Sequence, residues 1–129
     1  MTHSRFLQVQ CLAVDDDPLS LRLVEAACKK LNLDFLKASD VHQMIDVLKD
    51  ESPSLSLILL DNDIAGVRGH EVLDYVTDHL RSATQIIVYS SSVTPADRER
   101  YSRFNVKEYL AKPLTVDSLG FAIRRVLKI

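Results

Sequence analysis

Aspartates gather at two places in the sequence, and each group directly follows an apolar run. Residues 15–17 are three consecutive aspartates, and Asp61 and Asp63 stand on either side of one asparagine. Carboxylates held about 4 Å apart repel each other by on the order of 4 kcal/mol at an effective dielectric constant of about 20. A fold keeps such a cluster when a hard divalent cation with oxygen ligands, Mg²⁺ or Mn²⁺, offsets the repulsion. No grouping of cysteine and histidine suggests zinc instead.

A carboxylate in such a cluster can also act as a nucleophile toward phosphorus and form an aspartyl phosphate. A metal ion and a lysine then neutralise charge on the transferring phosphoryl group. In this chain Asp15 and Asp16 would hold the metal, and Asp61 would attack. Lys112 would pair with the phosphoryl group, and the Ser90 hydroxyl could donate a hydrogen bond to it.

Apolar runs and helical stripes alternate along the whole chain, and this alternation predicts the elements that position those residues. Strands are expected at 9–14, 34–38, 57–60, 86–89 and 108–111. Apolar residues at helical spacing predict helices over 24–31, 41–48 (stopped by Pro53), 72–80 and 119–127, and Thr94-Pro95 begins a short polar helix. The fold class is therefore α/β, a single doubly wound (βα)5 domain over 1–129, with a five-stranded parallel sheet and helices on both faces.

Ligands of such sheets bind beyond the carboxyl ends of the strands. Residues 15–17, 61–63, 90–92 and 112–113 follow four different strands, so carboxylates, hydroxyls and one ammonium group should meet there. Taken singly, each piece has an ordinary interpretation. Asp17 before Pro18 is expected to be a helix N-cap, a serine run is usually a loop, and Lys-Pro alone indicates nothing.

The composition is that of one globular domain, with 47% hydrophobic and 26% charged residues in 129. A net charge of −2 argues against nucleic acid and anionic membranes as partners. No apolar run approaches the roughly 20 residues of a membrane-spanning helix. The N-terminus lacks the features of a signal peptide, so a cytoplasmic location is expected. Cys11 and Cys28 are interpreted as core residues, not as a disulfide or metal site.

Taken in order, these segments resemble the receiver domains of response regulators in bacterial-type two-component signalling. The resemblance covers roughly Val9 to Leu127. The segments that carry it are 12–18 (LAVDDDP), 57–61 (LILLD) with Gly69 eight residues on, Ser90, and 109–113 (YLAKP). It implies the strand order 2-1-3-4-5 and phosphorylation of Asp61 by a histidine kinase or a histidine phosphotransfer protein.

The resemblance also implies roles for single residues. The acid at Asp16 would bind the metal directly, the acid at Asp15 largely through water, and Asp63 through its backbone carbonyl. The peptide bond between Lys112 and Pro113 is expected to be cis.

Phosphorylation would draw the Ser90 hydroxyl toward the phosphoryl oxygens, and the Tyr109 ring would turn into the vacated space. This would change a partner-binding face made by helix four, strand five and helix five. The resemblance implies a regulatory phosphoacceptor that catalyses only its own phosphorylation and dephosphorylation, as a monomer or a phosphorylation-dependent homodimer.

The sequence departs from the family pattern at several positions. Ile64-Ala65 replaces a common Met-Pro, and the missing proline is expected to loosen that loop. Asn105 stands where the family prefers glycine, and it is expected to adopt the left-handed conformation. Asp63 adds charge beside Asp61 and is expected to alter the lifetime of the phosphoryl group. Arg68 is expected to be solvated, with pairing to Asp63 as the alternative.

The remaining charged and titratable residues carry no clear site. No two of the histidines stand at ligand spacing, and all are expected at the surface: His3, His42, His70 and His79. A set of basic residues is interpreted as a solvated polar face or, alternatively, as a docking surface. Its members are Arg98, Arg100, Arg103, Lys107, Arg124, Arg125 and Lys128.

Two rival functions stay open. Asp61-Asn62-Asp63 matches the D-x-D motif of haloacid-dehalogenase-type phosphohydrolases, although the acidic triplet precedes it here and no cap domain is expected. An interaction module that is never phosphorylated could also use the same fold. The chain stops after the fifth helix with no output domain, so we expect a stand-alone signalling protein or a domain excised from a longer one.

Overall fold

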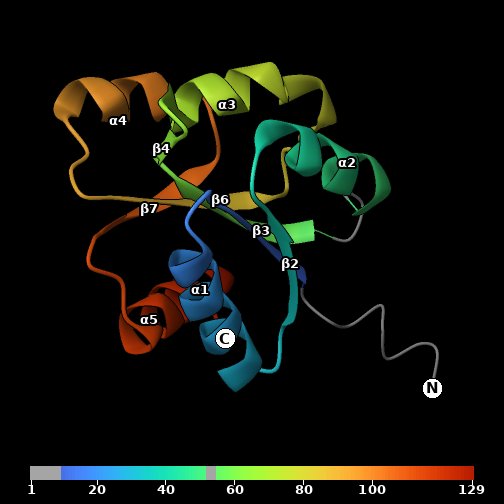
Figure 1. Cartoon of the computed structure of the whole chain (residues 1–129), viewed down its shortest axis with the longest axis vertical. Helices are drawn as coiled ribbons and strands as arrows, with labels where there is room; N and C mark the ends of the chain where they lie inside the picture. Colours follow the sequence, from blue (N-terminus) through green and yellow to red (C-terminus); the bar gives the residue numbers. More distant parts are fainter. Residues whose placement is uncertain (1–9, 52–54) are drawn as a thin grey trace.

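Five parallel strands form the central sheet of the computed structural model, which describes residues 10–51 and 55–129 (Figure 1). The strands lie in the order β2-β1-β3-β6-β7. Their bounds are β1 Gln10–Val14, β2 Asp34–Ala38, β3 Leu55–Asp61, β6 Gln85–Ser90 and β7 Val106–Ala111. Counted among themselves along the chain, these strands have the expected order 2-1-3-4-5, and the sheet is the parallel α/β sheet that the alternation predicted. His3, Val9 and Pro53 lie outside the described residues.

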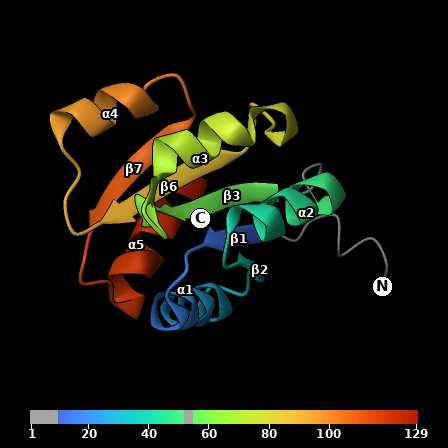
Figure 2. The same cartoon turned by 45° about the horizontal axis from the view of Figure 1, so that its top comes forward.

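Helices cover both faces of the sheet, as Figures 1 and 2 show. Helices α1 and α5 pack on one face, and helices α2, α3 and α4 pack on the other. Their bounds are α1 Pro18–Lys30, α2 Val41–Glu51, α3 Gly69–Tyr75, α4 Pro95–Tyr101 and α5 Val116–Leu127. Because both faces are covered, the three central strands β1, β3 and β6 are apolar along most of their length, whereas the edge strands β2 and β7 also carry charged residues.

Alternation along each strand divides the core into two layers. On β1, Cys11 and Ala13 face α1 and α5, whereas Leu12 and Val14 face the other three helices. Cys28 of α1 packs in the same layer as Cys11, and both cysteines are fully buried free thiols, as predicted. Burial is the main reason that a thiol in such a layer behaves as a small apolar group.

Two helix starts agree with the sequence prediction. Asp17 caps α1 by accepting a hydrogen bond from the Leu19 amide, and Thr94 caps α4 by accepting one from the Asp97 amide. The third helix is shorter than predicted. Helix α3 ends at Tyr75 and is followed by a 3₁₀ turn over Thr77–His79, where the Thr77 hydroxyl donates to the Leu73 carbonyl at 2.8 Å. That bond gives the carbonyl a partner other than the next helical amide.

Two expectations about single residues were wrong. Asn105 is not among the residues with positive φ, so it does not adopt the left-handed conformation. Its side-chain amide instead donates to the carbonyls of Ser82 (3.2 Å) and Thr84 (3.0 Å), which tethers the start of β7 to the loop before β6. His70 is buried rather than at the surface, and it packs edge-on against the Tyr101 ring.

Replacing Asn105 with glycine, the residue that the family prefers, is therefore expected to destabilise the protein by about 1–2 kcal/mol. The two side-chain hydrogen bonds would be lost, and no left-handed strain would be relieved. Urea unfolding measures this change. Asn32→Gly is the matched control, because Asn32 has a φ of 60° and glycine should be tolerated there without loss. If Asn105→Gly left the free energy of unfolding unchanged, the two side-chain hydrogen bonds of Asn105 would not contribute to stability, contrary to this prediction.

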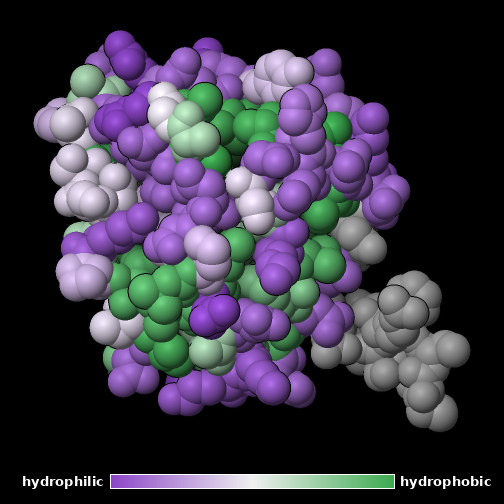
Figure 3. Space-filling view, viewed as in Figure 1, coloured by the Kyte–Doolittle hydropathy of each residue, from purple (hydrophilic) through white to green (hydrophobic). Residues whose placement is uncertain are grey.

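Figure 3 shows an apolar patch over α1 and α5 on the surface of the molecule. Leu19 of α1 and Phe121 of α5 are large apolar side chains that are about 60% exposed (62% and 60%).

Within the described ranges, none of the helices has both the length and the apolar character needed to cross a bilayer.

Candidate functional site

Three aspartates converge where β1 and β3 end. Asp15 and Asp16 directly follow β1, and Asp61 is the last residue of β3, which pairs with β1. Because the strands are parallel, both ends lie at the same edge of the sheet. One carboxylate oxygen from each residue lies within 4.8 Å of the other two. The structure thus brings together the acids that the strand pattern predicted.

Hydrogen bonds from distant segments hold the first two acids. Asp15 is completely buried, and its Oδ1 accepts from the Asp17 amide at 2.9 Å. Its Oδ2 accepts from the phenol of Tyr89, a residue of β6, at 2.8 Å. Asp16 is exposed, and its Oδ2 accepts from the Ala65 amide at 3.1 Å.

Asp61 is nearly buried, with 5% of its surface exposed. Its Oδ1 accepts from the Asp63 amide at 3.2 Å, and its Oδ2 pairs with Lys112 Nζ at 3.4 Å. Burial and then the charge of Asp15 raise the pKa of the Asp61 carboxyl to about 6, against the opposing effects of the Asp63 amide and Lys112. The carboxyl is therefore mostly ionised above about pH 6, where it can act as a nucleophile.

The segment after Asp61 forms a short antiparallel hairpin rather than an irregular loop. Strands β4 (Asp63–Ile64) and β5 (Val67–Arg68) pair through a two-residue turn, which the sequence did not predict. Ala65 and Gly66 both have positive φ, 51° and 84°, as a tight hairpin turn requires. Proline could neither adopt that φ nor supply the Ala65 amide that binds Asp16. The departure from the family pattern thus adds a contact to the acidic site.

The Arg68 side chain is partly exposed (39%), but it does not pair with Asp63, so that expected alternative was wrong. Its guanidinium binds the carboxylate of Asp97 on α4 at 2.8 Å. The Asp97 side chain is only 5% exposed, and burial alone would raise its pKa. Hydrogen bonds from Thr94 and Arg68 outweigh burial and lower the pKa of Asp97, so the carboxylate stays charged.

A buried polar chain links the residue after Asp61 to α4, and sequence reasoning missed it. The side-chain carbonyl of Asn62 accepts from the Tyr101 phenol at 2.5 Å, and its amide lies 3.5 Å from Asp97. Asn62 and Tyr101 are both fully buried. The Tyr101 ring in turn contacts the ring of Tyr109 on β7 at 5.9 Å between centroids. An asparagine directly after a buried strand was the only sequence signal for this chain of contacts.

Two hollows adjoin the acidic cluster. One, of about 380 Å³, is lined by Asp16, Asp17, Asp61, Asp63, Arg68, Ser90, Ser91, Ser92 and Lys112. The second, of about 250 Å³, lies between Ser90 and Tyr109. The Ser90 hydroxyl donates to the Ser92 carbonyl at 2.9 Å, so it has a partner other than Asp61 here. The peptide bond between Lys112 and Pro113 is cis.

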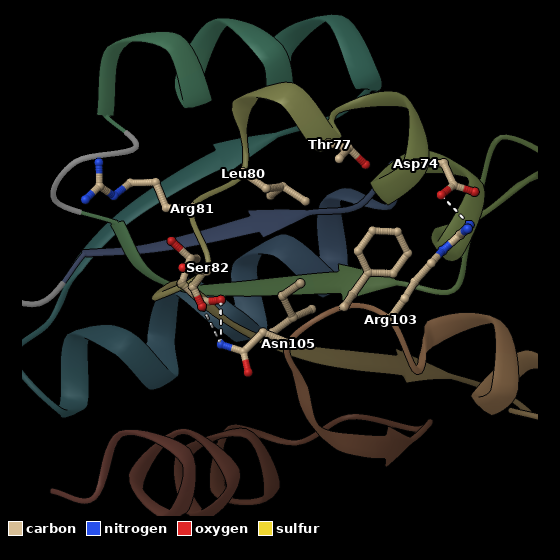
Figure 4. A pocket seen from close by; sticks show the side chains of 10 residues that line it. Asp74, Thr77, Leu80, Arg81, Ser82, Arg103 and Asn105 are labelled. Carbon is tan, nitrogen blue, oxygen red and sulfur yellow. Dashed lines mark hydrogen bonds and ion pairs between the residues drawn. The ribbon is translucent and has the colours of Figure 1, made fainter.

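A larger hollow of about 610 Å³ lies at the opposite end of the strands (Figure 4). It borders the residues that precede β6 and β7, among them Thr84 and Asn105. Arg103 forms an ion pair with Asp74 on its wall, and Asn105 bonds to backbone carbonyls. Several of its polar side chains thus already have partners, and Asp74 is the one carboxylate among the described residues that line it.

The acidic cluster has the right chemistry for a divalent cation. Asp15, Asp16 and Asp61 offer three carboxylate oxygens in close approach, and hard oxygen donors of this kind suit Mg²⁺. Asp63 also lines the hollow of about 380 Å³ beside this cluster. These residues could hold a metal ion.

The family of the chain follows from a comparison of its sequence with known families. The family model of response regulator receiver domains matches residues 11–124, so the chain belongs to this family of two-component signalling proteins. Receiver domains are regulatory proteins rather than ordinary enzymes, and they bind Mg²⁺ at an acidic site. The cluster of Asp15, Asp16 and Asp61 could hold such an ion.

Curated relatives are identical to this chain at about a quarter of the aligned residues. Protein PilH of Pseudomonas aeruginosa is 26% identical over 90% of this chain and 95% of PilH. The heme response regulator HssR of Staphylococcus epidermidis is 24% identical over 93% of this chain and 52% of HssR. The sensor histidine kinase CheAY of Helicobacter pylori is 24% identical over 92% of this chain. The chain spans 15% of CheAY, and therefore only a part of two of these relatives.

Solved structures share the fold. A CheY-like receiver domain protein from Methanospirillum hungatei has a TM-score of 0.81 and 19% identity, covering 94% of both chains. A response regulator protein from Burkholderia pseudomallei, solved with a phosphorylated aspartic acid, a calcium ion and citrate, has a TM-score of 0.74 and 17% identity. It covers 87% of this chain and 64% of that one.

Proposed function

We propose that this receiver domain accepts a phosphoryl group on Asp61 from a phosphohistidine of a histidine kinase or a histidine phosphotransfer protein. Asp15, Asp16, Asp61 and the backbone carbonyl of Asp63 would hold Mg²⁺ or Mn²⁺. When bound, the metal ion would neutralise charge on the phosphoryl oxygens. The observation that carries the proposal is the meeting of three carboxylates within 4.8 Å, with Lys112 on the one that is nearly buried.

The transfer needs little covalent chemistry from the protein. An Asp61 oxygen forms a bond to phosphorus as the bond between phosphorus and the histidine nitrogen breaks. The electron pair of the broken bond stays on the imidazole nitrogen, which takes up a proton. Lys112 moves from the Asp61 carboxylate to the phosphoryl oxygens, because the added negative charge lies there.

A change of shape would carry the signal away from Asp61. The Ser90 hydroxyl would leave the Ser92 carbonyl and donate to a phosphoryl oxygen. The hollow shared by Ser90 and Tyr109 gives the tyrosine ring space to turn. Tyr109 is half-buried, and the guanidinium of Arg98 on α4 lies 4.4 Å above its ring, so a turn of the ring would disturb α4.

The face made by α4, β7 and α5 is the proposed contact surface for a downstream protein. Part of its basic character is already neutralised within the chain, because Arg125 of α5 pairs with Glu108 of β7. A small movement on phosphorylation could separate this ion pair, and the guanidinium of Arg125 would then be free to bind a partner. A Burkholderia pseudomallei response regulator protein with this fold was solved with a phosphorylated aspartic acid, which supports an aspartate as the phosphoacceptor.

Mass spectrometry after treatment with acetyl phosphate and Mg²⁺ tests the proposal. The wild-type protein is expected to gain the mass of one phosphoryl group, and Asp61→Asn is expected to gain none. Asp46→Asn is the matched control, since Asp46 is an exposed aspartate of α2 away from the cluster. Chelation of Mg²⁺ should abolish the gain in the wild-type protein.

Beryllofluoride separates the proposal from its rivals. With Mg²⁺ it should shift the NMR resonances around Asp61 and Tyr109, and an absence of shifts would support an interaction module that is never phosphorylated. Steady turnover of a phosphomonoester, lost in Asp63→Asn, would instead indicate a phosphohydrolase. Either result would overturn the proposed function.

A further inference from the structure

Tyr89 stands beside Asp61 in the sheet, yet its hydroxyl reaches Asp15. On β6 it is the register partner of Asp61 on β3, and its ring lies on the face covered by α1 and α5. β1 lies on the far side of β3, so the phenol extends across the central strand to reach the acid at the end of β1. Both the phenol and the acid are fully buried.

Tyr89 contacts both an acid and the lysine of the site. Its hydroxyl donates to Asp15 Oδ2 at 2.8 Å, and Lys112 Nζ lies 5.6 Å from the centre of its ring. Burial and the nearby charge of Asp15 raise the pKa of Tyr89, so the phenol keeps its proton and acts as a donor. A buried tyrosine hydroxyl usually has a hydrogen-bond partner, and here that partner is one of the acids of the proposed metal site.

We infer that Tyr89 is a positioning residue for the metal site, which it serves by fixing the carboxylate of Asp15. The inference rests on the proposed metal site of the receiver function and names the residue that supports it. With the Asp17 amide on Oδ1 and the Tyr89 phenol on Oδ2, both oxygens of Asp15 are held in place before any cation binds. Each oxygen keeps a second lone pair for the ion or one of its waters.

The physical basis is the support that hydrogen-bonded neighbours give to a metal ligand. A carboxylate free to rotate loses conformational freedom when an ion binds, and a fixed one has already lost it. Loss of such a neighbour typically lowers metal affinity by about 10- to 100-fold. Asp16 has a comparable support, but it comes from the backbone amide of Ala65, which only a substitution by proline would remove.

Tyr89→Phe removes only the hydroxyl and keeps the ring in the core. In the full chain, the Kd for Mg²⁺, measured by NMR titration or calorimetry, is expected to rise about 10- to 100-fold. Tyr101→Phe is the matched control, because it also deletes a buried phenol hydrogen bond, but one made to Asn62 and not to an acid. The control should leave the Kd within about twofold of wild type, while both variants lose about 1 kcal/mol of stability.

A double-mutant cycle shows whether Tyr89 acts through Asp15. In an Asp15→Asn background, Tyr89→Phe should change the Kd for Mg²⁺ by less than about twofold, because the carboxylate that it positions is gone. An unchanged or tighter Kd in the single variant overturns the inference, as does an undiminished effect in the Asp15→Asn background. Wild-type protein that binds Mg²⁺ but gains no phosphoryl group would overturn the proposed function alone.

Discussion

Asp61→Asn is expected to stabilise the metal-free protein by about 3 kcal/mol at about pH 8. Burial raises the pKa of Asp61 from 3.8 to about 6 in the folded protein, and each pKa unit corresponds to about 1.4 kcal/mol. Between these two values the folded state binds more protons than the unfolded state, so the contribution of Asp61 to stability falls as pH rises through this range. Above about pH 6 Asp61 is ionised in both states, so the folded protein bears the full cost of burying its charge. Asparagine has no charge to bury and avoids this cost.

Urea unfolding in the presence of a chelator, at about pH 4 and about pH 8, measures the difference between the two proteins. The advantage of the asparagine variant should be small at the lower pH, because Asp61 is then largely protonated in the folded state. Added Mg²⁺ should reduce the difference in the free energy of unfolding at the higher pH, because it binds the folded wild-type protein more tightly than the folded variant. A variant that is less stable than wild type at about pH 8 without metal would show that Asp61 is not destabilised by its surroundings.

Gly69→Ala is expected to destabilise the protein by about 3 kcal/mol, at the upper end of the usual range for overpacking. A Cβ atom at position 69 would lie 2.1 Å from the Tyr101 hydroxyl and 3.1 Å from the Asp61 carbonyl oxygen. Tyr101 cannot move aside cheaply, because it is fully buried and its hydroxyl donates to Asn62. The glycine is thus required by a close approach of side chains, not by its backbone conformation.

Tyr101→Phe removes the clashing oxygen and should recover a large part of the loss in the Gly69→Ala background. Gly120→Ala is the matched control, since a Cβ atom there meets nothing within 4 Å. In the interior of α5 this substitution should stabilise the protein by up to about 1 kcal/mol. Equal effects of the two glycine substitutions in denaturant unfolding would argue against the clash.

The order of apolar runs and helical stripes was sufficient to predict the sheet and its covering helices. A run such as 57–60 is typical of a strand buried on both faces, and Asp17 and Thr94 cap helices through amides two and three residues further on. These features depend on contacts between residues close in sequence, which a pattern records directly. The hairpin after Asp61 escaped prediction because its turn contains an alanine at positive φ, which alanine rarely adopts.

The meeting of Asp15, Asp61 and Lys112 could also be predicted, because the carboxyl ends of parallel strands share one edge of the sheet. That rule indicates which strand ends meet, but not which atoms bond. Arg68 is five residues from Asp63 in the sequence, yet it binds Asp97, which is 29 residues away. The hairpin and the start of α4 decide that pairing by where they direct the two side chains.

By itself, then, the sequence determined the fold, the acidic cluster and the lysine beside it. Tertiary structure alone decided which neighbours support that cluster, as with the phenol of Tyr89 on Asp15, 74 residues away along the chain. The physical reason is range. Backbone conformation and burial follow from neighbouring residues, whereas a hydrogen bond across a central strand depends on how strands stack and on how far one side chain extends.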